Sequence, residues 1–155
     1  MLISESQKAS AYALWLLSGR DYAVEELRKK LLKKHKEKGW TCDIEKIIAD
    51  LLRSHYLDDE RFARRFIEAR LEFRPRGKYL IGRELSMKGI DKDLFEKMWK
   101  ALRVDEETVA RKAFLLKERT IMKVEDPRKR KEKIIMLLKG RGFQPDVIYK
   151  IAEEA

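Results

Sequence analysis

The chain has 155 residues, enough for one or two ordinary domains, and 44% of them are hydrophobic while 41% are charged. This balance excludes a disordered chain, and no apolar run approaches the roughly 20 residues that a membrane span needs. Lysine and arginine number 37 against 27 acids, giving a net charge of +10 that favours nucleic acid, an acidic protein or an anionic membrane surface as partner.

The first part of the chain predicts three helices. Residues 9–17 form a short apolar helix, Asp21 caps the second helix, and a third begins after Gly39-Trp40. The order of charges, acids early and lysines late, suits the dipole of the second helix. The apolar residues expected to face the core are Tyr12, Trp15, Leu16, Leu17, Val24, Leu27, Leu31, Leu32, Ile44, Ile47, Ile48, Leu51 and Leu52.

The central stretch predicts two helices joined at residues 74–77, followed by a third that Asp91 opens. Acids at residues 58–60 meet the positive end of the first helix, Pro75 stops it, and the second ends at Lys88-Gly89. The residues expected to face inward are Phe62, Ala63, Phe66, Ile67, Leu71, Tyr79, Leu80, Ile81, Leu85, Leu94, Phe95, Met98, Trp99 and Leu102.

The last part predicts a helix from Asp105 to about Met122, a second starting at Asp126-Pro127, and a third that Pro145 opens. No short alternating apolar run indicates a strand. The residues expected to face inward are Val109, Ala110, Ala113, Phe114, Leu116, Ile134, Ile135, Leu137, Leu138, Val147, Ile148 and Ile151.

A glycine, a large apolar residue after it, and apolar residues five and nine positions after the glycine recur three times, at a period of about 50 residues. Any capped amphipathic helix yields similar offsets, but three sets agree without a gap. We therefore predict an all-α fold of three tandem three-helix repeats, 1–56, 57–103 and 104–155, forming an elongated, curved array. The sets are Gly39, Trp40, Ile44, Ile48; Gly89, Ile90, Leu94, Met98; and Gly142, Phe143, Val147, Ile151.

Residues able to perform catalysis or bind a metal are few. His35, His55 and Cys42 match no zinc spacing, and no phosphate-binding GxxxxGK[ST] loop is present. The acids at 58–60 could hold Mg²⁺, but helix capping accounts for all three. We therefore predict no enzyme, no cofactor and no metal. The single cysteine and the absence of a signal-peptide pattern predict a cytoplasmic protein without a disulfide.

Basic residues form the stronger candidate site. Arginine is prominent in the central stretch, its planar fork suits phosphate or carboxylate, and cations crowd the turn at 74–77, where they repel one another. A solvated surface is the alternative, and contacts of this kind would carry no base specificity. The candidates are Arg64, Arg65, Arg70, Arg74, Arg76, Lys78 and Arg83, with Arg128, Lys129, Arg130 and Lys131 as a second patch.

Several short motifs of the chain stand out together, namely Tyr56-Leu57-Asp58-Asp59-Glu60-Arg61-Phe62-Ala63, Arg76-Gly77, Glu84-Leu85, Lys88-Gly89-Ile90, Arg20-Asp21 and Glu26-Leu27. They resemble the signature of the RecX family, bacterial regulators of the RecA recombinase. The first-repeat loop at residues 35–38 is longer than its second-repeat counterpart, and no long basic extension of the kind found in some members precedes the first helix.

This resemblance implies a monomer that binds along the groove of the RecA–single-stranded-DNA filament and binds single-stranded DNA weakly on its own. It would limit filament growth and inhibit ATP hydrolysis, strand exchange and coprotease activity, with ATP bound by RecA alone. Two other hypotheses stay open. One is a helical DNA-binding protein that acts without RecA, and the other is a metal-dependent nuclease that uses Asp58, Asp59 or Glu60.

Overall fold

A computed structural model describes residues 2–155, which form ten α-helices and no strand. This confirms the all-α prediction. The helices are α1 (Glu5–Gly19), α2 (Val24–Lys38), α3 (Ile44–Arg53), α4 (Asp59–Phe73), α5 (Lys78–Met87), α6 (Lys92–Ala101), α7 (Glu106–Leu115), α8 (Glu118–Ile121), α9 (Pro127–Gly140) and α10 (Pro145–Glu154).

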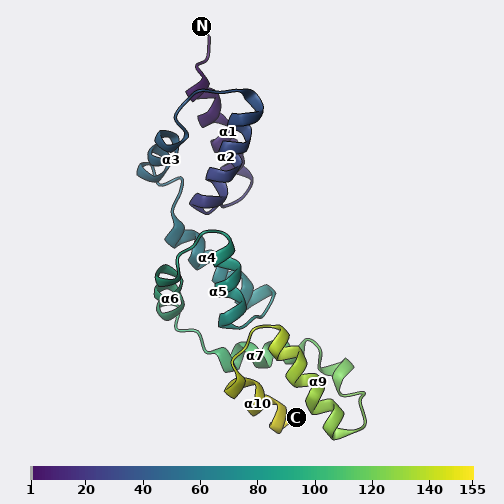
Figure 1. Ribbon diagram of the computed structural model, residues 1–155. Helices are drawn as coiled ribbons and strands as arrows, with labels where there is room; N and C mark the ends of the chain where they lie inside the picture. The colour runs from purple at the N-terminus through teal and green to yellow at the C-terminus, as the bar shows by residue number, and fades with distance from the viewer. Residues whose placement is uncertain (1) are drawn as a thin grey trace.

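The helices form three units that follow one another along an elongated column, with the two ends of the chain at opposite ends (Figure 1). The first unit is α1–α3, the second α4–α6 and the third α7–α10, and the helix pairs that pack most closely lie within one unit. The predicted tandem three-helix repeat is therefore confirmed, with α8 as an extra short helix in the third unit. The exact boundaries at 56/57 and 103/104 stay predictions.

Each unit has its own hydrophobic core, built around one helix. The fully buried pairs are Leu27 and Leu31 on α2, Ile81 and Leu85 on α5, and Ile134 and Leu138 on α9. The members of each pair are four residues apart, so both project from the same face of their helix. This repeated burial explains why the same apolar spacing recurs along the sequence.

The three glycines of the repeated motif end these same helices. Gly39, Gly89 and Gly142 have φ values of 64°, 83° and 83°, in the left-handed region that a side chain disfavours. The residues that follow Gly89 and Gly142, Ile90 and Phe143, are buried in the second and third cores. The glycine therefore turns the chain so that the next apolar residue enters the core.

Two equivalent hydrogen bonds join the units. The Asp59 carboxylate, at the start of α4, accepts from the Val24 N–H at the start of α2, at 2.8 Å. The Glu106 carboxylate, at the start of α7, accepts from the Lys78 N–H at the start of α5, at 3.3 Å. The first helix of each following unit thus caps the middle helix of the unit before it, and we call these contacts the two joints.

The glycines that follow α5 and α9 also contact the preceding unit at the joints. A Cβ atom on Gly89 would lie 2.4 Å from the Glu25 side chain, and one on Gly142 would lie 2.5 Å from Leu80 Cβ. In the first unit, a Cβ atom on Gly39 would meet nothing within 4 Å. At the joints, glycine is therefore required both for its positive φ and because a side chain would clash with the neighbouring unit. At Gly39 only the positive φ favours glycine.

Four predicted helix boundaries are wrong. The first helix, expected at residues 9–17, spans Glu5–Gly19 and begins at the Ser4 cap. Asp21 does not cap α2, which begins at Val24; its carboxylate instead forms an ion pair with Arg65, at 2.9 Å. Residues 35–38 are not a loop but the last turn of α2. The helix expected to reach Met122 ends at Leu115, and the chain turns into α8 so that Ile121 is buried in the third core.

Several residues expected to face inward are exposed. Tyr79 is 71% exposed and Leu116 67% exposed, and Trp15, Leu32 and Leu52 also face solvent. The apolar stripe on each of these helices is wider than the face that its neighbours cover. Periodicity locates the apolar face of a helix, but it does not show how much of that face a neighbouring helix covers.

Candidate functional site

The central arginines divide into paired and unpaired groups. Arg70 and Arg76 lie 2.9 and 3.9 Å from the Glu84 carboxylate, and Lys78 lies 2.8 Å from that of Glu96. Together with Arg65, these candidates already have an acidic partner within the chain. The remaining three, Arg64, Arg74 and Arg83, are exposed and have no ion pair among residues 2–155.

The second candidate patch lies on the first turns of α9. Four consecutive helical residues point in directions about 100° apart, so they cannot share one face. Arg128 lies 3.7 Å from Glu132, and Arg130 donates to the Val124 carbonyl at 3.2 Å. Of these four residues, only Lys129 and Lys131 are both exposed and without an ion pair in the described chain. A binding role for any of the eleven candidates stays a prediction.

A pocket of about 240 Å³ lies where the turn between α4 and α5 meets the third unit. Four cations line it, and none of its lining residues is acidic. We call it the junction pocket; its lining residues are Phe73, Arg74, Pro75, Arg76, Ala113, Leu116, Lys117 and Arg141.

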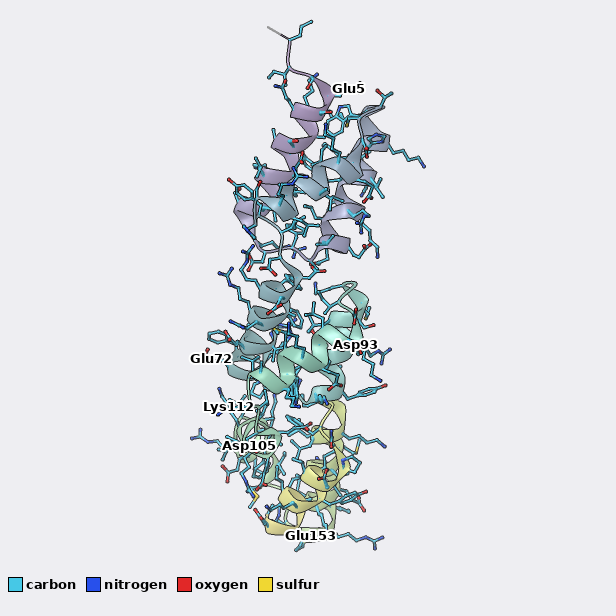
Figure 2. The ribbon with its side chains drawn as sticks, turned by 90° about the vertical axis from the view of Figure 1, so that its left-hand side faces the viewer. Glu5, Glu72, Asp93, Asp105, Lys112 and Glu153 are labelled. Carbon is cyan, nitrogen blue, oxygen red and sulfur yellow. The ribbon has the colours of Figure 1, made fainter. Side chains whose placement is uncertain are left out.

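Close contacts hold the turn between α4 and α5 against the third unit beside the junction pocket. The Gly77 N–H donates to the Arg141 carbonyl at 2.8 Å, which ties the α4–α5 turn to the end of α9. A Cβ atom on Gly77 would lie 2.2 Å from the Gly142 carbonyl oxygen, so only glycine allows this approach. A further bond joins the same two units: Lys112 donates from Nζ to the Glu72 carbonyl at 2.7 Å, and Figure 2 shows these two residues near each other.

A second, larger groove of about 780 Å³ lies between α5, α6 and the start of α10. The candidates Lys78 and Arg83 line it, together with Lys92 and the exposed ring of Tyr79. The structure therefore divides the central candidates between two hollows. Arg74 and Arg76 lie in the junction pocket, Lys78 and Arg83 lie in the second groove, and the other three, Arg64, Arg65 and Arg70, line neither.

The sequence hypotheses did not single out Lys117, Arg141 and Lys92 as site residues. Lys117 and Arg141 lie 40 or more positions after the turn at 74–77 and reach it only because the third unit packs there. The repeat offered one indication of Arg141. It precedes Gly142 as Lys88 precedes Gly89, and both glycines lie at joints in the structure. Lys92 follows Asp91, the N-cap of α6, and gave no distinguishing pattern.

The acids at residues 58–60 act in helix ends and joints. Asp58 accepts from the Arg61 N–H at 3.1 Å as the N-cap of α4, and Glu60 lies 3.4 Å from Lys97. Burial raises the pKa of the Asp59 carboxyl above its usual value, although the Val24 N–H bond opposes this. Burial likewise raises the pKa of Glu106 at the second joint, against the Lys78 N–H bond. Capping therefore accounts for Asp58 and Asp59, whereas Glu60 forms an ion pair, so the prediction that all three acids are caps is wrong for Glu60.

Metal-binding and membrane-spanning features are not found in the described chain. No group of three histidine, cysteine, aspartate or glutamate side chains among residues 2–155 is arranged to hold a metal ion. None of the helices within that range is both long and apolar enough to cross a bilayer.

Known proteins resemble this chain along nearly all of its length. Residues 58–98 match the family model described as RecX, second three-helix domain. Over 152 residues the chain is 32% identical to the regulatory protein RecX of Prosthecochloris aestuarii, covering 97% of this chain and 95% of that protein. The chain belongs to the RecX family. The resemblance predicted from the short motifs around residues 56–90 is thereby confirmed.

A second RecX relative and two solved RecX structures agree with this assignment. The regulatory protein RecX of Chlorobium limicola is 33% identical over 144 residues, covering 91% of this chain and 85% of that protein. The crystal structure of RecX from Lactobacillus salivarius has a TM-score of 0.74 and 24% identity, covering 96% of this chain and 95% of that one. Another crystal structure of a regulatory protein RecX has a TM-score of 0.77 and 20% identity, covering 100% of this chain and 81% of that one. At these identities the two structures support the fold, and the curated relatives place the chain among regulatory proteins.

Proposed function

We propose that this protein binds along the RecA–single-stranded-DNA filament and limits its growth, which lowers ATP hydrolysis, strand exchange and coprotease activity. Membership of the RecX family supports a regulatory role. The observation that carries the proposal further is the set of unpaired cations, Arg64, Arg74 and Arg83 among them, on units that are joined end to end. A filament offers DNA phosphates and repeated protein surfaces along one axis, which suits such an array.

In this proposal, inhibition follows from contacts with several RecA protomers at once. Each contact is weak, but the second and third units bind at a high effective concentration once the first is bound. A ligand that prefers one arrangement of neighbouring protomers shifts their equilibrium towards it. The protein would act as a cytoplasmic monomer, bind no cofactor and leave nucleotide hydrolysis to RecA.

The test measures single-stranded-DNA-dependent ATP hydrolysis by RecA in the presence of increasing amounts of this protein. We expect the wild-type protein to slow hydrolysis below equal stoichiometry. Arg74→Glu should raise the half-inhibitory concentration about threefold to tenfold, because a repulsive charge replaces an attractive one at the interface. Arg74 is exposed and has no ion pair in the described chain, so circular dichroism should show unchanged helix content.

Lys30→Glu is the matched control, since it makes the same change in charge at an exposed position of α2. Its half-inhibitory concentration should stay within about twofold of the wild-type value. Absence of inhibition by folded wild-type protein at micromolar concentration would contradict the proposal. Tighter binding to naked single-stranded DNA than to the filament would instead support a DNA-binding protein that acts without RecA.

A further inference from the structure

The junction pocket has a composition that the filament proposal does not by itself explain. It combines four cations with an exposed aromatic ring, and its walls come from two different units. We propose that the junction pocket holds one nucleotide of a single-stranded nucleic acid, with a phosphate on its cations and a base against Phe73. This inference rests on the proposed function, because it assigns the DNA contact of that function to named residues.

The charges of the pocket favour an anionic ligand. Arg76 lies 3.9 Å from Glu84, but Arg74, Lys117 and Arg141 have no ion pair in the described part of the chain. No acidic side chain lines the pocket, so its cations repel one another until an anion enters. Three of the four are arginines, whose planar fork can donate two parallel hydrogen bonds to a phosphate.

The pocket is formed before any ligand binds. The bond from the Gly77 N–H to the Arg141 carbonyl fixes the backbone of Arg141 relative to the turn that carries Arg74 and Arg76. Pro75, at the centre of that turn, is buried and restricts its backbone. A ligand therefore does not have to order this turn when it binds, which reduces the entropic cost of binding.

The volume of the pocket favours part of a polymer over a complete small molecule. At about 240 Å³, it is smaller than the roughly 300–1,000 Å³ of pockets that enclose whole small ligands. Two of its lining residues, Phe73 and Leu116, are exposed, so the rest of a polymer can lie on the surface beside them. One nucleotide unit would occupy the pocket while its neighbours lie on the surface.

Phe73 distinguishes a nucleic acid from an acidic protein segment. Its ring is 74% exposed at the edge of the pocket, where it stabilises no core. A base can stack on such a ring, and base–aromatic stacking contributes about 1–3 kcal/mol per base. A carboxylate gains nothing comparable from an aromatic ring. Bases in a duplex are already stacked on one another, so the ring favours a single strand.

The experiment measures binding of labelled oligothymidylate to the full chain by fluorescence anisotropy at low salt. Phe73→Ala should weaken binding about fivefold to tenfold through the loss of stacking. Arg141→Gln should weaken binding and reduce the slope of log affinity against log salt by about 0.7, the value for one phosphate contact with a single strand. The backbone carbonyl of Arg141, which bonds to Gly77, is unchanged in that variant.

Two controls separate stacking from general effects. Trp15→Ala removes an aromatic ring of similar exposure, 68%, from α1, outside both hollows, and should leave affinity unchanged within about twofold. An abasic strand of the same length should bind more weakly than oligothymidylate and be insensitive to Phe73→Ala. Equal effects of the two aromatic variants would overturn the assignment, as would equal affinity for the two strands. Polyglutamate binding that depends on Phe73 would overturn it in favour of an acidic protein segment.

Comparison of the strand-binding results with the RecA assay separates this inference from the proposed function. If the wild-type protein does not inhibit RecA but its strand binding depends on Phe73, the proposed function fails and the pocket assignment stands. If the protein inhibits RecA but oligothymidylate binds without dependence on Phe73, or does not bind, the pocket assignment fails and the proposed function stands.

Discussion

Single residues at equivalent positions of the repeat have different surroundings. Gly39 and Gly142 both end a helix with a positive φ, but only Gly142 lies against another unit, at Leu80. Gly140, two positions earlier in α9, has neither a positive φ nor a neighbour within 4 Å of an added Cβ atom. These three glycines therefore allow backbone strain and steric contact to be measured separately.

We expect three different outcomes when these glycines are replaced by alanine. Gly39→Ala should lower the free energy of unfolding by about 1–2 kcal/mol, the cost of left-handed backbone. Gly142→Ala should cost about 2–4 kcal/mol, because displacement of Leu80 adds to the same strain. Gly140→Ala should stabilise the protein by about 0.5–1 kcal/mol. Urea denaturation measures all three, and equal costs at Gly39 and Gly142 would contradict the steric argument at the joint.

Helices of neighbouring units meet end to end, and a carboxylate links them at each joint. Asp59 lies at the start of α4, where the helix dipole favours its negative charge, and it also accepts the Val24 N–H at the start of α2. Burial nevertheless raises the pKa of its carboxyl, so removal from water outweighs both favourable contributions. The joint therefore contains a carboxylate that is less easily ionised in the fold than in the unfolded chain.

This direction predicts a specific dependence on pH. Because the folded protein binds this proton more readily, the ionised carboxyl contributes an unfavourable term that disappears as pH falls through its raised pKa. In urea titrations between pH 7 and about 4, the stability of the wild-type protein should therefore rise relative to that of Asp59→Asn. Asp59→Ala should cost about 1 kcal/mol at neutral pH, since the Val24 N–H loses its acceptor. A relative loss of wild-type stability towards acid pH would show that the assigned direction is wrong.

The helices could be predicted from the sequence because local signals fix them. The caps Asp58, Asp91, Asp105 and Asp126 each precede an apolar stripe, and each accepts a backbone N–H of its own helix in the structure. The joints could not be predicted. Asp59 and Val24 are 35 positions apart, and nothing in the residues beside either one indicates a hydrogen bond between them.

The junction pocket was only half predictable, for the same reason. Arg74 and Arg76 stand out in the sequence because they crowd a turn, whereas Lys117 and Arg141 look like ordinary helix-end cations. What brings the four together is the packing of the third unit on the α4–α5 turn, through the Gly77–Arg141 backbone bond. Such packing depends on long-range contacts that residue spacing does not record.

At the scale of the whole molecule, the two joints determine how the units act together. The donors at the joints are the N–H groups of the first residues of α2 and α5, Val24 and Lys78. The corresponding first residue of α9 is Pro127, which has no N–H, and Asp126 caps that helix from within its own unit. The start of α9 therefore cannot form a third joint of this kind.

In a chain of units that contact only their neighbours, stability is the sum of the units and the joints between them. Weakening one joint should therefore uncouple the units beside it before it unfolds either one. We expect the wild-type protein to unfold in a single calorimetric transition, and Glu106→Ala to split it, with the third unit separating from the first two. The expected loss is about 1 kcal/mol for the unsatisfied Lys78 N–H.

The adjacent Glu107 provides the matched control, because its carboxylate bonds to Arg111 and Lys150, both within the third unit. Glu107→Ala removes the same charge from the same helix turn but leaves the joint intact. It should shift the transition without splitting it. If Glu106→Ala also gave one transition, the coupling would lie in the glycine contacts and the Gly77–Arg141 bond, and the joint carboxylates would contribute only as helix caps.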